Sequence, residues 1–262
     1  MKRRDFLKTS AALASLSAFA ASVRAADEAP GSEREFYELR LYHFRMGAKQ
    51  KLFDDYCRNA AIPALNRAGI KPVGIFNVMV GPDSPTAYML LPCATFEALA
   101  AAREKVWADE VYQKAGAAFL NAATDDPAFV RMESTFLRAF AGMPKLDATT
   151  MAGKPRVFEM RTYESPSEKA GRKKVEMFNQ GEIAIFRRAG LMPIFFGEAL
   201  MGVNLPRLTY MIGFPDVAER AKNWAVFGSD PEWKRLSGMP EYAGIVSNIT
   251  NILLQPAPYS QI

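Results

Sequence analysis

Histidine and cysteine are nearly absent from this sequence, and their scarcity excludes several kinds of site. The 262 residues include one histidine, His43, and two cysteines, Cys57 and Cys93. A single imidazole rules out a multi-histidine metal site, and the two cysteines have no zinc or iron–sulfur spacing. An exported chain could join them in a disulfide, but the second half of the chain has Phe178 where the first has Cys57, which favours buried free thiols.

Long apolar runs are also lacking, and the run nearest the start is typical of an export signal. Residues 11–21 are alanine-rich and too short to span a bilayer comfortably. They follow Arg3-Arg4, the mark of a twin-arginine signal, and precede a small-residue cleavage site at Ala25. An ordinary secretory signal or an uncleaved anchor is the alternative. We expect a twin-arginine signal peptide over residues 1–25, a flexible tether over residues 26–34, and a periplasmic or secreted protein.

A large charge of one sign is lacking once this leader is set aside. The leader carries five basic residues and Asp5, so its removal takes the chain from 33 basic and 28 acidic residues to 28 and 27. Nucleic acids and anionic membranes bind surfaces with a basic excess. We therefore expect no nucleic-acid partner and no stable membrane anchor after cleavage.

What the sequence does contain is an internal repeat. Residues 36–42, Phe-Tyr-Glu-Leu-Arg-Leu-Tyr, return as residues 157–163, Val-Phe-Glu-Met-Arg-Thr-Tyr. The same offset of 121 places Gly81 on Gly202, and with one inserted residue Tyr88-Met89 falls on Tyr210-Met211. The chain is therefore a tandem duplication.

Each copy has the pattern strand, helix, strand, strand, helix, strand. The expected elements are residues 36–42, 49–68, 73–80, 86–91, 95–108 and 129–140 in the first copy, and 157–163, 167–189, 194–201, 208–214, 216–227 and 245–254 in the second. Pro63 should kink or break the first helix. The expected domains are a first unit at 35–141, a linker at 142–155, a second unit at 156–256 and a C-terminal tail at 257–262.

This order predicts an α+β fold made of two tandem ferredoxin-like units with antiparallel sheets. Helices should cover one face of each sheet, and the uncovered faces should close on each other as an intramolecular, pseudo-dimeric α/β barrel. Successive side chains of a strand point to opposite faces. We expect the apolar face to meet the helices and the polar face to line the enclosed interior or its mouth, with Glu38, Arg40, Tyr42, Glu159, Arg161 and Tyr163.

Several of these segments resemble the NIPSNAP family. The resemblance lies in the Tyr-Glu-Leu-Arg-x-Tyr strand from Tyr37, its repeat from Phe158, the glycines Gly81 and Gly202, and the segment Ser229-Asp230-Pro231-Glu232-Trp233. The first copy departs from the last motif, with Asp109-Glu110-Val111-Tyr112. The resemblance implies the dimeric α/β-barrel superfamily, which includes cofactor-free monooxygenases, haem-degrading enzymes and chlorite dismutase. It implies no defined reaction.

Charged and hydroxyl side chains of the repeated strand are the candidate site. Glu38, Arg40, Glu159 and Arg161 are the expected ligand-binding residues, because arginine binds carboxylates and phosphates well. A self-satisfied polar network is the equally weighted alternative. The expected catalytic residues are His43, Tyr42 and Tyr163. His43 is also the sole imidazole that could bind haem, although a strand-end histidine facing solvent is the plainer interpretation. No cofactor motif is evident.

Three functions remain open from the sequence. The protein binds or processes a small-molecule ligand in a cavity between its two units, or it is a monooxygenase-like or haem-handling enzyme. The third alternative is a structural or partner-binding module whose barrel is filled by its own side chains. Assembly into a homo-oligomer is left open.

Overall fold

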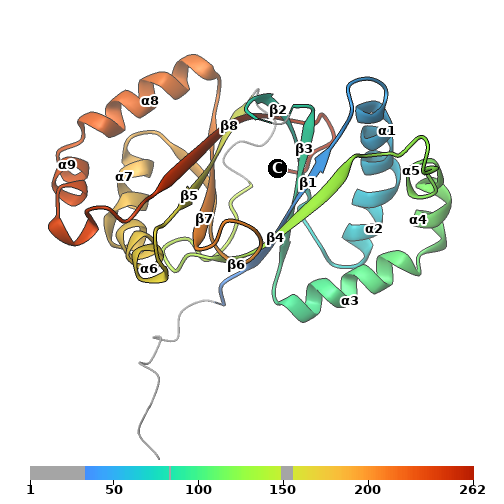
Figure 1. Cartoon of the computed structure of the whole chain (residues 1–262), viewed down its shortest axis with the longest axis horizontal. Coiled ribbons are helices and arrows are strands. Elements are labelled where there is room, and N and C mark those ends of the chain that lie inside the picture. The colour runs from blue at the N-terminus through green and yellow to red at the C-terminus, as the bar shows by residue number, and fades with distance from the viewer. Residues whose placement is uncertain (1–32, 83, 149–155) are drawn as a thin grey trace, which may run out of the picture. The chain divides into compact units, whose positions relative to one another are not determined.

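Eight antiparallel strands of the described residues close into a barrel (Figure 1). The computed structural model describes residues 33–82, 84–148 and 156–262. The expected signal peptide, most of the tether and the second half of the linker lie outside the described residues. No helix in the described part of the chain has both the length and the apolar character needed to span a bilayer.

The two copies contribute four strands each and are joined by hydrogen bonds at two seams. Around the barrel the order is β1-β3-β2-β8-β5-β7-β6-β4, so β2 pairs with β8 and β4 pairs with β6 across the copies. The predicted intramolecular barrel is thus confirmed. The strands are β1 (Phe36–His43), β2 (Gly74–Val80), β3 (Thr86–Cys93), β4 (Arg131–Ala139), β5 (Val157–Glu164), β6 (Met192–Met201), β7 (Arg207–Phe214) and β8 (Asn248–Pro256).

Helices cover the outer face of the barrel, in one layer for each unit. Figure 1 shows the first unit's helices to the right of the strands and the second unit's to the left. The first layer is α1 (Lys49–Tyr56), η1 (Cys57–Ala61), α2 (Ile62–Arg67), α3 (Phe96–Trp107), α4 (Glu110–Ala115) and α5 (Ala117–Leu120). The second is α6 (Glu168–Met177), η2 (Phe178–Glu182), α7 (Ile183–Arg188), α8 (Val217–Ser229), α9 (Pro231–Ser237) and η3 (Pro240–Tyr242).

Pro63 does not break the first helix. The helix runs through it from α1 to α2, with a π-helical turn at η1 just before the proline. The second unit has the same π-helical turn at η2, where Ala184 takes the place of Pro63. The turn is therefore a property of the fold and not of the proline. Such π-helical turns often lie at functional sites.

Large apolar side chains fill the barrel interior. Tyr37 and Phe195 pack with ring centroids 5.2 Å apart, and Phe76 packs on Phe158 at 5.1 Å, so both pairs cross from one unit to the other. The buried members of this cluster are Tyr37, Leu39, Phe76, Tyr88, Leu90, Leu137, Ala139, Phe158, Met160, Ile194, Phe195, Met211, Ile252, Leu254 and Ile262.

The prediction of which strand face lines the interior was therefore wrong. Leu39 belongs to the interior cluster, whereas Tyr42 packs against Phe53 and Phe119 of the helical layer. The physical reason is that apolar side chains pack the middle of the closed interior, while the covering helices supply arginines for the buried glutamates. The expected ligand cavity between the units is occupied by protein.

Strand pairing also corrects the alignment of the two copies. Arg40 lies opposite Met89 on β3, and Arg161 lies opposite Tyr210 on β7. Met89 and Tyr210 are thus equivalent at a constant offset of 121, and the expected one-residue insertion does not exist.

The C-terminal tail is part of the fold. Ile262 lies in the interior cluster, and Gln261 and Ser260 accept hydrogen bonds from the backbone N–H groups of Val73 and Ile75. The tail therefore covers one end of β2. Both cysteines are buried free thiols, as the sequence favours.

Candidate functional site

Glu38 and Arg40 lie on the outer face of β1, beneath α3. The Glu38 carboxylate is buried and accepts hydrogen bonds from Arg40 Nη2 at 2.8 Å, from Ser134 Oγ at 2.8 Å and from Arg103 of α3. Burial alone would raise the pKa of Glu38, but the bonds from Arg40 and Arg103 lower it below its ordinary value. Glu38 is therefore an anion held between two cations.

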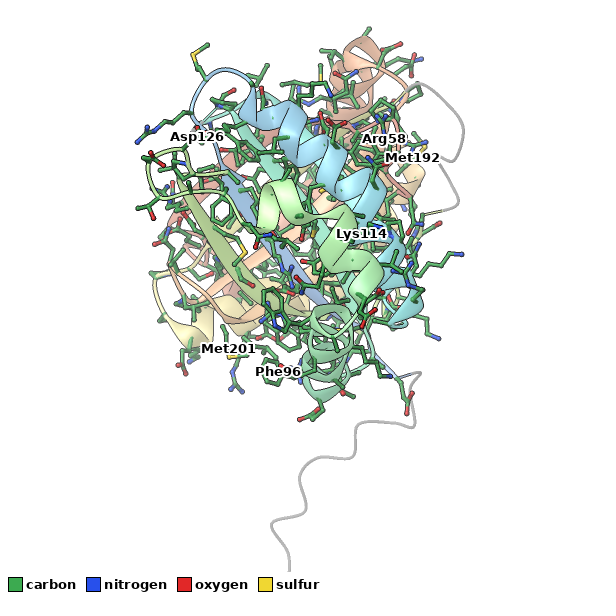
Figure 2. The ribbon with its side chains drawn as sticks, turned by 90° about the vertical axis from the view of Figure 1, so that its right-hand side faces the viewer. Arg58, Phe96, Lys114, Asp126, Met192 and Met201 are labelled. Carbon is green, nitrogen blue, oxygen red and sulfur yellow. The ribbon has the colours of Figure 1, made fainter. Side chains whose placement is uncertain are left out.

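A cavity of about 340 Å³ opens between this strand face and the helices of the first unit. We call it the first-unit pocket. Figure 2 shows the helical layer that covers it, with Phe96 at the start of α3 and Lys114 on α4 labelled. The lining residues are Arg40, Tyr42, Tyr56, Ala61, Leu65, Met89, Arg103, Val106, Trp107, Tyr112, Phe119, Leu120, Phe129 and Met132.

Arg40 presents unused donors to this pocket. Its Nη2 donates to Glu38, and its Nε is buried without a hydrogen-bond partner among the described residues. Burial by itself would lower the pKa of Arg40, but the Glu38 carboxylate raises it, so the guanidinium stays charged. A ligand oxygen in the pocket can therefore accept from a desolvated cation.

Three tyrosines contribute hydroxyl groups to the pocket. Tyr56 OH and Tyr112 OH are hydrogen-bonded to each other at 2.9 Å, and Tyr42 stands beside Arg40 on the strand. Burial raises the pKa of both Tyr56 and Tyr42 above the usual tyrosine value. Tyr56 and Tyr42 therefore keep their protons, and their hydroxyl groups can donate or accept hydrogen bonds near the ligand.

The matching place in the second unit is filled by larger side chains. The Glu–Arg pair is kept there as Glu159 and Arg161, linked at 2.9 Å. Around it the constant offset pairs Ala61 with Glu182, Leu65 with Phe186, Met89 with Tyr210, Arg103 with Trp224, Val106 with Phe227 and Tyr112 with Trp233.

In the second unit the Trp224 side chain covers Arg161. The indole ring lies 4.8 Å from the Arg161 guanidinium carbon, and its Nε1–H donates to Glu159 Oε2 at 2.6 Å. Arg220 of α8 donates twice to the same carboxylate. Tyr163, predicted to be catalytic, is hydrogen-bonded to Tyr210 at 2.8 Å inside the aromatic cluster. Glu159, Arg161 and Tyr163 thus form a self-satisfied network, the alternative that the sequence left open.

A buried ion pair helps to fill this place. Lys174 Nζ lies 2.7 Å from Glu182 Oε2, at positions held by Phe53 and Ala61 in the first unit. Complete burial raises the pKa of Glu182 above its ordinary value in spite of the lysine.

His43 is separate from the first-unit pocket. It lies at the end of β1 on the interior side, with Nε2 3.1 Å from Glu133 Oε1 and Nδ1 3.1 Å from Thr86 Oγ1. It does not join Tyr42, which faces the helices. His43 is buried and does not face solvent, and its Nε2, although close to Glu133, makes no hydrogen bond within the described residues. The described lining of the first-unit pocket contains no imidazole, so His43 and this pocket do not form one haem site. Within the described ranges no cluster of three His, Cys, Asp or Glu side chains could hold a metal.

The residues that complete the pocket were not predicted from the sequence. Arg103, Tyr56, Tyr112 and Met89 come from elements whose positions were predicted but whose side chains were not singled out. The sequence feature that could have identified them is the difference between the two copies at equivalent positions, above all Arg103 in the first and Trp224 in the second.

Comparison with known families agrees with the repeat. The family model described as NIPSNAP matches residues 37–144 and again residues 158–261. The chain belongs to the NIPSNAP family. A search of curated proteins finds no match for this NIPSNAP chain.

Solved structures show the same fold at low sequence identity. A candidate monooxygenase from Lactobacillus acidophilus aligns with a TM-score of 0.55 at 9% identity, over 86% of this chain and 94% of that one. An anthrone oxidase-like protein aligns with a TM-score of 0.51 at 11% identity, over 86% and 92%. A NIPSNAP-like domain protein from Burkholderia xenovorans is 24% identical over 40% of this chain and 89% of its own, with a TM-score of 0.37. At these identities the two longer alignments indicate a shared fold.

Proposed function

We propose that the first-unit pocket binds a small, largely apolar molecule that lies on Arg40. The observation that carries this proposal is the contrast between the copies. Both keep the Glu–Arg pair. In the first unit a cavity opens above it, where six surrounding positions carry smaller side chains than in the second unit, while in the second unit the Trp224 ring lies on the arginine. A purely structural role for the pair would not need the open space. Pockets with apolar walls and a few convergent polar groups are typical ligand sites.

The net charge of the side chains at the base of the pocket decides which ligand groups are favoured there. Arg40 and Arg103 together carry one positive charge more than Glu38 neutralises. A ligand that presents a hydrogen-bond acceptor, a negative charge or the electron-rich face of an aromatic ring is favoured there, because arginine binds each of these. Leu65, Met89 and the aromatic residues of the lining supply the apolar wall.

A second candidate function is cofactor-independent oxidation of the bound molecule. Its support is the pairing of a charged arginine, which stabilises an anionic form of a ligand, with neutral tyrosine hydroxyls that can exchange a proton with it. The barrel proteins of similar fold, a candidate monooxygenase and an anthrone oxidase-like protein, are in keeping with this proposal. Oxygen uptake that depends on an added aromatic substrate tests it, and no uptake with molecules that bind the pocket would reject it.

Binding itself is tested with residues borrowed from the second unit. The double variant Leu65→Phe/Met89→Tyr places the second unit's side chains in the first-unit pocket. Native mass spectrometry of protein isolated from its own host should show a retained small molecule on the wild type and none on the variant. The control is Val111→Phe, which changes an exposed residue of α4 that does not line the pocket. Equal retention by wild type and the double variant would refute the proposal.

We also propose that the chain is exported in folded form by the twin-arginine route. The support is the Arg3-Arg4 pair and the short apolar run that follows it. Replacing both arginines by lysine should keep the protein in the cytoplasm, as cell fractionation would show. Unchanged export of that variant would count against the route.

A further inference from the structure

We infer that the first-unit pocket takes a flat aromatic ring bearing an N–H or O–H donor, which stacks on Arg40 and donates to Glu38. This inference rests on the proposed function and names the ligand class. Its basis is that the second unit contains such a ring as part of its own chain, at the matching place.

Trp224 shows how a ring sits on this Glu–Arg pair. The ring lies 4.8 Å from the Arg161 guanidinium carbon, within the range of a cation–π contact. Its one polar group, Nε1–H, reaches Glu159 Oε2 at 2.6 Å. The indole thus uses both members of the pair, the arginine through its face and the glutamate through a hydrogen bond.

Helix geometry makes the two places comparable. The N-cap residues Thr95 of α3 and Asp216 of α8 are 121 residues apart, the offset that also relates β1 to β5. Arg103 is therefore the counterpart of Trp224. The Arg103 side chain is 50% exposed and reaches Glu38 from the rim, so the volume taken by the indole in the second unit is part of the cavity in the first.

The Glu38 carboxylate accepts fewer hydrogen bonds than the equivalent Glu159 carboxylate. Within the described residues Glu159 accepts four hydrogen bonds, two from Arg220 and one each from Arg161 and Trp224. Glu38 accepts three, and its Oε2 receives just the one from Arg40. A carboxylate oxygen can accept two bonds. The vacant acceptor on Glu38 corresponds to the bond that the Trp224 indole makes in the second unit.

The ring class follows from these two contacts. An aliphatic acid could pair with Arg40 but would leave the vacant acceptor of Glu38 unfilled and gain no stacking energy. An aromatic ether or N-alkylated ring could stack but could not donate. A hydrogen bond to a buried charged acceptor contributes enough to binding to separate donors from non-donors by about tenfold or more.

Three probes of nearly equal size test the inference on the full-length mature protein. Indole carries the donor, 1-methylindole blocks it, and benzofuran replaces it with an oxygen. Isothermal titration should give a dissociation constant for indole about tenfold or more below those of the other two. In the variant Arg103→Trp, which installs the second unit's residue, indole binding should be lost because the chain supplies its own ring.

A matched control comes from the second unit. Trp224→Ala removes the internal ring, so indole should then bind at a second place with the same preference over 1-methylindole. If that variant does not fold, the comparison of the three probes on wild-type protein stands alone.

The outcomes separate the inference from the proposed function. Equal affinities for the three probes in a pocket that Leu65→Phe/Met89→Tyr blocks would overturn the inference and leave the proposed function intact. Binding of none of the probes, with another molecule retained in native mass spectra, would do the same. Absence of any bound molecule under both measurements would overturn both.

Discussion

At the scale of single residues, positions 103 and 224 decide which unit has a pocket. The same pair of strand residues lies beneath both, yet Arg103 reaches across the rim while Trp224 covers the arginine with its ring. Other differences between the copies also favour a cavity in the first unit. Met89 and Ala61 are smaller than Tyr210 and Glu182, which stand at the equivalent positions of the second unit. The two units share one backbone fold, and a few side chains decide whether the site above the Glu–Arg pair is a cavity or is filled by protein.

Truncation of these two side chains should therefore have unequal costs. Trp224→Ala should lower the free energy of unfolding by about 3 kcal/mol, because it removes a large packed ring and the bond to Glu159. Arg103→Ala should cost less than about 1 kcal/mol, because that side chain is half exposed and its ion pair is screened. Urea unfolding of both variants provides the comparison. Equal losses would contradict the assignment of Trp224 as filling.

Acid should weaken the fold through the buried glutamates. Burial alone would raise the pKa of Glu159, but hydrogen bonds from Arg220, Trp224 and Arg161 lower it below the ordinary value of 4.5. The unfolded chain then takes up a proton at a higher pH than the folded chain. The stabilisation is complete above about pH 4.5 and is lost as pH falls through the folded pKa.

The variant Glu159→Gln isolates this effect. Its stability deficit relative to the wild type should be largest near neutral pH and should shrink below pH 4.5, as measured by urea midpoints across that range. A deficit that stays constant down to pH 3 would show that folding does not lower the pKa of Glu159.

At the scale of elements, both units begin the short helix after the long one in the same way. Asp230 accepts from the backbone N–H groups of Glu232 and Trp233 and pairs with Arg188. Asp109 accepts from Val111 and Tyr112 and pairs with Arg67. The first copy lacks the proline and tryptophan of the second, yet the cap and its arginine are kept. The motif therefore has an architectural role in both copies.

Removal of either cap should have the same effect. Asp109→Ala and Asp230→Ala should each lower the melting temperature by a few degrees, about 2–4 °C, because each loses a helix N-cap and an arginine partner. Differential scanning calorimetry measures both. A shift confined to Asp230→Ala would mean that the first unit does not depend on its cap.

Local sequence patterns predict most helices and strands, but they do not predict which face of a strand meets the helices and which faces the barrel interior. The internal repeat and the strand and helix patterns of each copy predicted the order of strands and helices, and the structure confirms it. Alternation alone says that Glu38 and Leu39 point to opposite sides. It cannot say which side meets the helices when both sides are covered, and in a closed barrel both are.

At the scale of the whole described unit, the barrel makes the two copies interdependent. The seams β2–β8 and β4–β6 carry backbone hydrogen bonds between the copies, and the interior cluster draws side chains from both. Neither half has a complete core without the other. The first-unit pocket, in contrast to the core, is built from one unit, because its described lining comes from the first unit alone. The space between the units, where the duplicated strand suggested a cavity, holds the apolar side chains of the interior cluster.

The halves should therefore fail to fold as independent monomers. Fragments 33–148 and 156–262 should each be unfolded or self-associate through the exposed sheet edges, and mixing them should restore a folded complex. Light scattering and circular dichroism distinguish these states. A stable, folded monomer of either fragment would refute this interdependence.

The most direct test of the account is a crystal structure of the protein with a bound aromatic probe such as indole. The account predicts one molecule per chain, in the space lined by Arg40, Tyr56 and Met89, with its ring over the Arg40 guanidinium. Density for the probe inside the barrel, or in the second unit beside an undisplaced Trp224, would contradict it.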